Sequence, residues 1–571
     1  MKADFFRNGS QKYPRHRCFL QLCMVALALL LTACATPLPK DVERPVSNAL
    51  EQSQKTALGS MIGKANPAGS RSSTSGFALI SGPEFALSSR MALVENAEKT
   101  LDLQYYAIHA DQSTSLLIRA LVKAAKRGVR VRVLLDDFHS TGPDAQVMRL
   151  AFVPNIEMRM FNPLAGSRGS SLGRAWTILT DFQRAQQRMH NKLFIADNVV
   201  AVMGGRNLGD AYFDASTDGN FVDLDVLSAG PVVKDLSRSF DSYWNNVRSY
   251  PVQSLISSDE LRQLKSQFEQ EDHKAQNAQA PATPSIAPAP MNLNKVPWVW
   301  AQAMVLADKP SKIPAEGDEL TSSQNAQTAS PGVISTSTIN KAVPAAQMRA
   351  ADSVVDGLLT LVRSAKKDLL VVSPYFVPGT EIMDAFRSAR TRGVRIRILT
   401  NSLASNDAPL AHAGYARHRQ ELLGLGIELR EMRSESANVR SALRAGATGA
   451  SGGSGGSGTG ASRAMLHSKL LVVDGKLVVI GSMNLDMRSQ HQNTEIAVLI
   501  VSRMFSRLAT DSIEDGLPEG SWLVQLDPQG KIVWRAPEGS GLQDASTEPD
   551  ASLGLRLMLQ LLGPLAPDSL L

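Results

Sequence analysis

The chain contains very little cysteine. Only three cysteines occur among its 571 residues, and Cys18, Cys23 and Cys34 all lie within the first 34 positions. The remainder of the chain can therefore form neither an internal disulfide nor a zinc site built from thiolates. Oxidation of thiols consequently has no part in the stability of the folded core.

The chain also lacks an apolar run long enough to be a confident membrane span. The apolar stretch near its start, CMVALALLLTAC at residues 23–34, is shorter than the roughly 20 residues that a spanning helix needs. A basic stretch followed by an apolar one is typical of an export signal. The basic residues that precede the apolar stretch are Lys2, Arg7, Lys12, Arg15 and Arg17. We therefore expect residues 1–34 to be a signal peptide, with an uncleaved anchor as the alternative.

The end of this segment, Leu31-Thr32-Ala33-Cys34, resembles the bacterial lipobox. In that motif the signal is cut before the cysteine, and the cysteine is acylated. The resemblance implies lipidation at Cys34 and a membrane-anchored lipoprotein of a Gram-negative bacterium that faces the periplasm. Ala35 follows the cysteine and favours the outer membrane under the usual sorting rule, which has exceptions, so inner and outer membrane both stay open.

A strong charge of one sign is missing from the body of the chain. The formal net charge is +6 and the pI is about 9.1, but five of the positive charges lie in the expected signal. The rest is nearly neutral, which gives little support to a nucleic-acid partner, although local basic patches stay possible. We expect no nucleic acid among the partners.

One sequence pattern occurs twice. Two segments match HxKxxxxD, where x is any residue, and their flanks continue alike. An asparagine lies 17 residues after each histidine, and an acidic residue follows further on. The first copy consists of His190, Lys192, Asp197, Asn207 and Asp223, and the second of His467, Lys469, Asp474, Asn484 and Glu495.

The spacing predicts the local geometry of each copy. Residues two apart on an extended strand point to the same face, so each histidine and lysine should project together. Asp474-Gly475 lies between the apolar runs LLVV and LVVI and predicts a tight hairpin turn. Asp197-Asn198 takes the same place in the first copy with weaker turn chemistry. The return strand should bring each asparagine back beside its histidine.

A longer internal repeat surrounds the two motifs. Residues 97–106 resemble residues 365–374, and each stretch leads through an amphipathic helix to Gly128 or Gly393 and a strand of alternating apolar and arginine residues. This rhythm predicts two α/β units, at 75–270 and 346–545. We expect an Ala/Pro/Ser-rich linker at 271–345, interrupted by a strand near 298–306 that begins the second unit. The C-terminal segment 546–571 is apolar and either lies at a membrane interface or covers a core.

The paired motifs, the asparagines and the acids resemble the phospholipase D superfamily. The lipoprotein start and the stretches LDLQYY, RGVRVRVLLDD and MNLDMRS are similar to bacterial cardiolipin synthases of the C type. The resemblance implies two similar α/β domains, each a mixed β-sheet flanked by helices, packed with pseudo-twofold symmetry. It also implies a phosphatidyltransferase that forms cardiolipin from phosphatidylglycerol and either phosphatidylethanolamine or a second phosphatidylglycerol, through a phosphohistidine. Membrane phospholipids would then be the partners, one chain would suffice for the site, and the need for a helper protein stays unknown.

The resemblance places both HxKxxxxD motifs in the catalytic set. It implies that His190 is the nucleophile and that His467 is the acid and later the base, although the sequence itself is symmetric on this point. Lys192, Lys469, Asn207 and Asn484 would hold the non-bridging phosphate oxygens, so no metal and no cofactor are expected. Asp197 and Asp474 belong to the motif, but we expect them to support the turn and a domain contact.

Asp223 and Glu495 are expected to accept a hydrogen bond from the far ring nitrogen of each histidine. Asp225 shares a strand face with Asp223 and competes with it for orienting His190. Arg206 and Arg488 are expected either to reach a second phosphate or to form salt bridges. Asp136 and Asp137, at the end of a predicted strand, are expected to be caps or loop anchors.

Two other functional classes fit parts of the pattern. The same residues would serve a hydrolase, either a phospholipase D or a phosphodiesterase nuclease, and a nuclease should also have a basic groove. A lipid-binding lipoprotein without catalysis is disfavoured by the two intact motifs.

Overall fold

The computed structural model describes residues 38–67, 73–140, 142–164, 181–256, 288–313, 353–434 and 463–565, with a few single residues outside these ranges. The expected signal with Cys34, most of the expected linker and the Gly/Ser-rich segment before His467 lie outside the described residues. Among the described residues, no helix combines the length and the hydropathy needed to cross a membrane.

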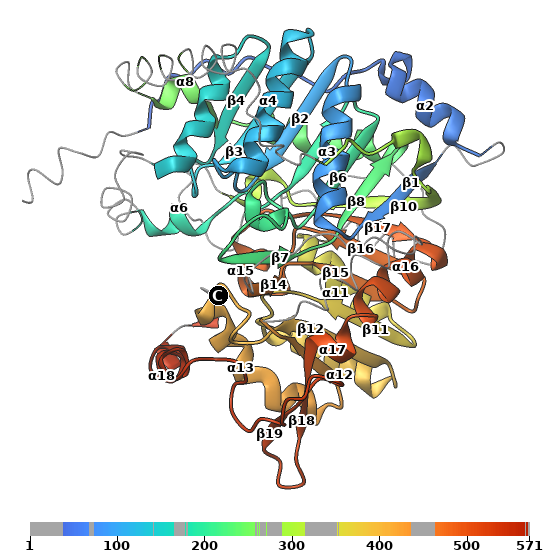
Figure 1. Ribbon diagram of the computed structural model, residues 1–571, viewed down its shortest axis with the longest axis vertical. Helices are drawn as coiled ribbons and strands as arrows, with labels where there is room; N and C mark the ends of the chain where they lie inside the picture. The colour runs from blue at the N-terminus through green and yellow to red at the C-terminus, as the bar shows by residue number, and fades with distance from the viewer. Residues whose placement is uncertain are drawn as a thin grey trace, which may run out of the picture.

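The first half of the chain alternates strands and helices (Figure 1, blue to green). Its elements are α2 (Ala57–Ala65), β1 (Thr74–Ile80), α3 (Pro83–Asn96), β2 (Thr100–Tyr105), α4 (Gln112–Lys126), β3 (Arg130–Asp136), β4 (Ile156–Phe161), α6 (Phe182–Gln186), β5 (Leu193–Ala196), β6 (Val200–Gly204), β7 (Gly219–Val222), β8 (Asp225–Ala229), α7 (Pro231–Trp244), β9 (Ser249–Pro251) and α8 (Val252–Leu255).

The second half repeats this order (Figure 1, lime to red). Its elements are β10 (Val299–Ala307), α11 (Val354–Ser364), β11 (Asp368–Val372), α12 (Thr380–Thr391), β12 (Arg395–Asn401), α13 (Pro409–Gly424), β13 (Glu428–Met432), β14 (Arg463–Leu466), β15 (Leu470–Val473), β16 (Leu477–Gly481), α15 (Met487–His491), β17 (Ile496–Val501), α16 (Arg503–Glu514), α17 (Leu517–Gly520), β18 (Ser521–Leu526), β19 (Ile532–Arg535) and α18 (Leu553–Leu562).

Within the described residues, one mixed sheet of 17 strands runs through both halves. The pairings give the order β9-β4-β3-β2-β5-β6-β8-β1-β10-β17-β16-β15-β11-β12-β13-β18-β19. The order from β1 out to β4 matches the order from β10 out to β13, and in both halves the three strands farthest from the centre in these series are parallel. The predicted α/β architecture of two similar halves with pseudo-twofold symmetry is confirmed.

The strand β10 lies at the centre of this sheet. It pairs with β1 of the first half and with β17 of the second, antiparallel in both cases. Its position in the second half matches that of β1 in the first. The strand expected near 298–306 is therefore present, and its pairing agrees with the expectation that it begins the second unit.

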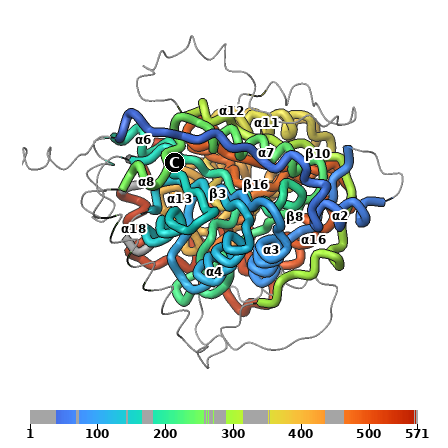
Figure 2. Tube along the Cα trace, turned by 90° about the horizontal axis from the view of Figure 1, so that it is seen from above, coloured from blue at the N-terminus to red at the C-terminus, as the bar shows by residue number. Residues whose placement is uncertain are grey.

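Helices cover both faces of the sheet. In Figure 2, α3 and α4 lie on one side of the first half and α7 lies on the other. The outer face of each half has its own apolar core, whereas α7 and α16 join one core that contains residues of both halves. Phe77 on β1 contacts Phe505 on α16, with ring centroids 6.2 Å apart. Burial of this shared core holds the halves together.

The predicted turns and helix stops are confirmed. The β5–β6 turn has Asp197 and Asn198 at φ of 50° and 52°, and the β15–β16 turn has Asp474 and Gly475 at 53° and 60°. Two successive positive φ angles are those of a type I′ turn, whose twist suits a hairpin. Gly128, like its counterpart after α12, also has a positive φ, of 93°, where α4 ends.

Candidate active site

Backbone segments from opposite halves meet at the site. The strand β7 runs parallel to β14, and Val222 pairs with Leu466 at the end of this ladder. The N–H of His467 then donates to the carbonyl of Val222 at 2.8 Å. In the matching arrangement, the N–H of His190 donates to the carbonyl of Thr494 at 2.9 Å. Each histidine is therefore fixed against the segment of the other half that carries the downstream acid.

The carboxylates that orient the histidines are exchanged between the halves. Nδ1 of His190 lies 2.9 and 3.0 Å from the two carboxylate oxygens of Glu495, and Nδ1 of His467 lies 2.6 Å from Asp223. The expectation that Asp223 or Asp225 orients His190 is wrong. The physical reason is the pairing of segments between halves, which places each acid beside the distant histidine and away from the histidine that precedes it in the chain.

Asp225 neutralises two buried arginines instead. Its carboxylate lies 3.0 Å from Arg90 and 3.2 Å from Arg206. All three side chains are almost completely buried, so the cluster is a structural ion network. Of the two alternatives for Arg206, the structure supports the salt bridge. Arg488 donates to the carbonyl of Gln186 in the first half at 3.5 Å, which places it at the junction of the halves.

The glycine at position 205 is required by the closeness of these groups. A Cβ on Gly205 would lie 2.6 Å from an oxygen of Asp223 and 2.9 Å from the carbonyl oxygen of His467. At the matching position of the second half, Ser482 donates its hydroxyl to Glu495 at 2.5 Å, and Ser489 donates a second one at 2.9 Å. The first half therefore has glycine at this position because Asp223 occupies the space of a side chain, and the second half has serine because Glu495 accepts its hydroxyl hydrogen bond.

The lysines hold symmetric positions. Nζ of Lys192 donates to the carbonyl of His190 at 2.7 Å, and Nζ of Lys469 donates to the carbonyl of His467 at 2.7 Å. Both side chains are only 1% exposed. Each ammonium is thereby held beside its own histidine, with donor capacity left over, since an ammonium carries three N–H groups.

The two asparagines lie in the same buried region. The side-chain amide of Asn207 donates to the Tyr212 hydroxyl at 2.9 Å and accepts from the N–H of Ala107 at 3.3 Å. Asn484 is 4% exposed, and its side-chain oxygen has no hydrogen-bond partner among the described residues. The second half therefore keeps an unused polar group at the site.

Burial determines the protonation of the histidines. Desolvation, together with the nearby ammonium groups, lowers the pKa of His190 to about 4 despite the opposing effect of Glu495. Burial likewise lowers the pKa of His467 well below its usual value, and Lys469, Lys192 and His190 lower it further. Because groups of both halves perturb one another, the two motifs share one electrostatic site. When no anion is bound, burial thus favours the neutral form of both imidazoles.

The pKa values of the charged groups beside the histidines are shifted as well. Burial lowers the pKa of Lys192 to about 7 and raises that of Asp223 to about 6, although Lys469 and Arg206 counteract the second shift. Burial also acts to raise the pKa of Glu495, but His190 and Lys192 outweigh it and hold that pKa below its usual value. A phosphodiester anion would stabilise the ammonium groups and the imidazolium form, which favours anion binding here.

The aspartates of the two motifs do not reach the histidines. Asp197 accepts hydrogen bonds from the backbone N–H groups of residues 98–100 at 2.8 to 2.9 Å, and Asp474 accepts from residues 366–368 at 2.7 to 3.2 Å. Their placement in a catalytic set is wrong, because these bonds occupy both carboxylates. The expected support of the turn is confirmed, but the contact is made within each half and not between domains.

Two further aspartates anchor the segment before His190. Asp136 accepts from the N–H of Met189 at 2.8 Å and pairs with Arg188 at 3.2 Å. Asp137 accepts from the N–H of Leu164 at 2.9 Å. Both residues are loop anchors, as expected, and Asp136 additionally fixes the backbone that carries His190.

Aromatic side chains surround the two histidines. The ring of Tyr106 lies 5.1 Å from that of His190, and Nζ of Lys192 lies 5.5 Å from the same tyrosine ring. The rings of Tyr212 and Phe221 lie 5.4 and 4.9 Å from His467. Nothing in the sequence around Tyr212 or Phe221 indicated that these two rings lie beside His467. These rings reduce the exposure of the site to water.

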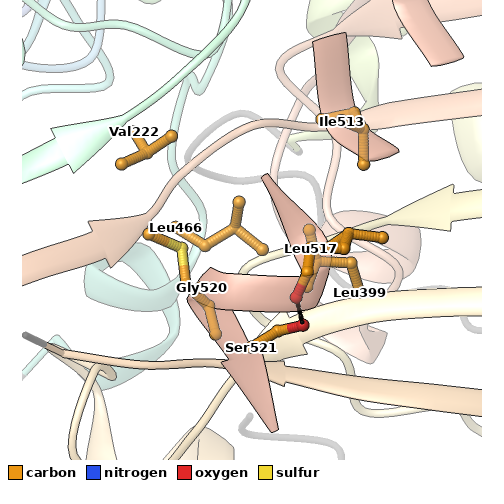
Figure 3. Close-up of a pocket in the computed structure, with 8 residues that line it drawn as sticks. Val222, Leu399, Leu466, Ile513, Leu517, Gly520 and Ser521 are labelled. Atoms are coloured by element: carbon orange, nitrogen blue, oxygen red, sulfur yellow. Dashed lines mark hydrogen bonds between the residues drawn. The ribbon is translucent and has the colours of Figure 1, made fainter. Parts of the chain in front are cut away.

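Two cavities lie near β7 and β14. One has a volume of about 10 Å³ and is lined by apolar side chains that include Val222 and Leu466 (Figure 3). It is too small for a substrate and holds at most a single water. The other measures about 400 Å³ and is bordered by Asp407, Arg463 and Met465. Met465 belongs to β14, the strand that precedes His467 in the chain. Within the described ranges, no group of three or more histidine, cysteine or acidic side chains could hold a metal ion.

Comparison with known proteins identifies the family. The family model described as "Cardiolipin synthase, PLD-like domain" matches residues 91–244 and 358–515. Cardiolipin synthase C of Escherichia coli (strain K12) is 35% identical over 502 residues, which cover 85% of this chain and 94% of that protein. Cardiolipin synthase of Geobacillus kaustophilus is 25% identical over 440 residues, or 77% of this chain and 65% of that protein.

A solved structure supports the same fold. The crystal structure of phosphatidylserine synthase from Haemophilus influenzae Rd KW20 aligns with a TM-score of 0.50 at 12% sequence identity, covering 86% of this chain and 94% of that one. The paired motifs, their convergence on one buried site and these matches agree. The chain belongs to the cardiolipin synthase family of phospholipase D-like proteins, a family of phosphatidyltransferases of the phospholipase D type.

Proposed function

We propose that this enzyme forms cardiolipin by moving a phosphatidyl group onto a glycerol hydroxyl of phosphatidylglycerol, with phosphatidylethanolamine or a second phosphatidylglycerol as the donor. The observation that carries the proposal is the exchanged pair of histidine–carboxylate contacts. Each carboxylate occupies the Nδ1 side of its imidazole, so each Nε2 is directed to the shared site. Two imidazoles with occupied Nδ1 atoms and two ammonium groups suit a phosphodiester.

The first step forms a covalent intermediate. Nε2 of neutral His190 attacks the phosphorus, and the bond from phosphorus to the headgroup oxygen breaks. The imidazolium form of His467 donates its proton to that oxygen, so the headgroup leaves as a neutral alcohol. Burial lowers the pKa of His467 in the empty site, and the negative charge of the bound phosphodiester stabilises the protonated form that the step requires.

The second step returns the enzyme to its starting state. His467, now neutral, takes the proton of the incoming glycerol hydroxyl, and the resulting alkoxide attacks the phosphorus of the phosphohistidine. The P–N bond breaks, and His190 is released neutral. Lys192 and Lys469 hold the non-bridging oxygens in both steps, where negative charge accumulates in the pentavalent state. Exclusion of water by the buried aromatic surroundings favours transfer over hydrolysis.

The remaining parts of the proposal concern the setting of the enzyme. All groups needed for both steps come from one chain, so a monomer suffices. We propose that Cys34 is acylated and that the enzyme acts from a periplasmic membrane surface on membrane phospholipids. Mass spectrometry of the mature N-terminus tests this part. A chain that begins with an acylated Cys34 supports it, and a chain that begins before position 34 and carries no acyl group contradicts it.

The catalytic proposal is tested in vesicles of phosphatidylglycerol and phosphatidylethanolamine, with the products read by mass spectrometry. Cardiolipin together with released ethanolamine or glycerol supports transfer. Phosphatidic acid as the only product refutes it and indicates a hydrolase. Vesicles of phosphatidylglycerol alone, run in parallel, identify the donor. Rapid acid-free quenching followed by peptide mapping identifies the histidine that carries the phosphatidyl group, and an adduct on His467 would reverse the two roles.

A further inference from the structure

The helix α18 has two apolar faces, of which only one is covered by described residues. Leu555 and Leu559 pack against Leu403 and Ala404 of the loop after β12. On the other side, Leu553, Leu557 and Leu561 follow one another at intervals of four residues and are 72%, 49% and 71% exposed. Residues four apart lie on the same side of a helix, so the three leucines form one stripe. We name these three residues the leucine stripe.

The stripe is the largest concentration of exposed apolar side chains in the described part of the chain. It accounts for three of the ten large apolar residues that are exposed there, and Leu410 on the adjoining α13 is a fourth, at 43%. Single exposed leucines are ordinary on protein surfaces, but a contiguous group marks an interaction surface. The helices α13 and α18 contact each other.

The position of α18 links the stripe to the active site. Leu555, on the covered face of α18, borders the cavity of about 400 Å³ together with Met465 and Arg463. Met465 lies on β14, two residues before His467. Burial lowers the pKa of Lys469, and the charge of Asp407, which borders the same cavity, acts in the opposite direction, so this cavity is electrostatically coupled to the catalytic lysine. Figure 1 shows α18 at the lower left edge of the second half, beside α13.

The dimensions of α18 determine how it could meet a membrane. Its ten residues rise about 15 Å, which is half the thickness of a hydrocarbon core, so it cannot span one. Its single charged residue is Arg556, and the stripe contains no polar side chain. The exposed face of α18 carries the three leucines with the uncharged Gln560 at its edge. A short helix with such a face fits the boundary between headgroups and acyl chains. It does not require a partner protein with a groove of matching shape.

We infer that the leucine stripe of α18 inserts into the bilayer surface and holds the mouth of the 400 Å³ cavity against the phospholipid headgroups. This inference rests on the proposed function, because it assigns the route by which bilayer lipids reach the two histidines. A lipid leaving the bilayer at α18 would pass Leu555 with its acyl chains and would present its headgroup to Asp407 and Arg463. The stripe would thus deliver substrate and take no part in the chemistry.

The first experiment measures insertion directly. Leu557→Cys in the full-length protein, labelled with an environment-sensitive fluorophore, is reconstituted into phosphatidylglycerol and phosphatidylcholine vesicles with and without spin-labelled acyl chains. Met504→Cys is the matched control, because Met504 is 64% exposed on α16, away from the stripe. The unsubstituted chain, treated in the same way, reports any label on the N-terminal cysteines. We expect a blue shift and quenching at position 557 and neither at position 504.

The second experiment separates delivery from chemistry. The triple variant Leu553→Gln, Leu557→Gln, Leu561→Gln is compared with Met504→Gln on vesicle lipids and on short-chain monomeric phosphatidylglycerol. We expect the triple variant to lose about tenfold or more on vesicles, as the loss of buried apolar side chains at an interface predicts, and to stay within about twofold on monomers. Equal losses on both substrates overturn the inference, since they indicate damage to the fold or the site.

Other occupants of the stripe give distinct results. If a second copy of the chain covers it, the label at position 557 shifts without vesicles, in a concentration-dependent way, and spin-labelled lipids do not quench it. If another segment of the same chain covers it, the shift without vesicles is independent of concentration. Either result overturns the inference. Failure of the proposed function itself is recognised separately, because the fluorophore reports insertion whether or not any lipid is converted.

Discussion

Because each carboxylate contacts the histidine of the other half, a substitution of the carboxylate in one half should impair the catalytic step of the histidine in the other half. We expect Glu495→Gln to impair His190 and Asp223→Asn to impair His467, although neither acid lies in the half of the histidine that it orients. A glutamine can place its amide N–H toward Nδ1 of His190, which selects the tautomer whose Nε2 carries the proton. That tautomer has no lone pair at Nε2 with which to attack phosphorus.

The size of the effect follows from the contacts that are lost. Glu495 accepts from His190 at 2.9 Å and from Ser482 and Ser489, so it holds the ring and its tautomer through a fully bonded carboxylate. Loss of the orienting carboxylate in a Ser-His-Asp triad costs about 10⁴-fold in kcat by the same change of tautomer. We therefore expect a fall of about 10³- to 10⁴-fold in kcat, equivalent to about 4 to 5.5 kcal/mol.

The assay is a rapid-quench experiment that follows the phosphatidyl-histidine adduct by mass spectrometry, together with steady-state turnover. With His190 as nucleophile, Glu495→Gln should slow formation of the adduct. Asp223→Asn should slow both protonation of the leaving group and breakdown of the adduct. Thermal melting of both variants controls for loss of fold. Turnover of Glu495→Gln within about threefold of the unsubstituted enzyme, or a defect that tracks the histidine of the same half, would refute the reasoning.

Three further predictions concern charge, stability and metal dependence. Lys192, with a pKa of about 7, is charged below that pH, so kcat/KM should fall as the pH rises above 7, while His190, with a pKa of about 4, stays neutral down to that pH. Lys192→Arg should move the alkaline fall upward, and an unchanged pH profile would show that Lys192 does not bind the phosphate. Asp197→Ala should lower the free energy of unfolding by about 3 kcal/mol or more, because three backbone N–H groups lose a buried acceptor, whereas Asp474→Ala, whose N–H partners are more exposed, should cost about half of that. Denaturant unfolding checks this difference, which vanishes if the two aspartates are equivalent. His190→Ala and His467→Ala should each abolish turnover, whereas EDTA should not change the rate of the unsubstituted enzyme. If EDTA inhibits the enzyme and added metal restores its activity, the proposal that the lysines stabilise the phosphate charge without a metal ion is contradicted.

Much of the architecture could be predicted because local patterns occur twice. The hairpins after His190 and His467 follow from apolar alternation and from Asp and Gly at the turns, and these depend only on neighbouring residues. The central place of β10 could not be predicted in full, because strand order depends on contacts between segments far apart in the chain. A short strand between polar segments carries no local sign of its partners.

The partners of the histidines illustrate the same limit. The strand periodicity predicts that the side chains of Asp223 and Asp225 lie on the same face. It does not show whether residues of the first or of the second half pack against that face. The answer depends on the pairing of β7 with β14 and on the ion pairs that hold Asp225 with Arg90 and Arg206. The aspartates of the two motifs support the turns, as expected, which shows that a position within a recurring pattern can reflect a turn as readily as a reaction.

The ladder between β1 and β10 has a consequence for movement of the enzyme. A hinge between the halves would have to break backbone hydrogen bonds in the middle of the sheet and open the core beneath them. It would also separate His190 from Glu495 and His467 from Asp223, so an opened enzyme would lose both of the contacts that fix the tautomers of its histidines. Turnover must therefore proceed with a rigid frame, and any rearrangement that admits one lipid and releases another is confined to the loops and helices at the rim.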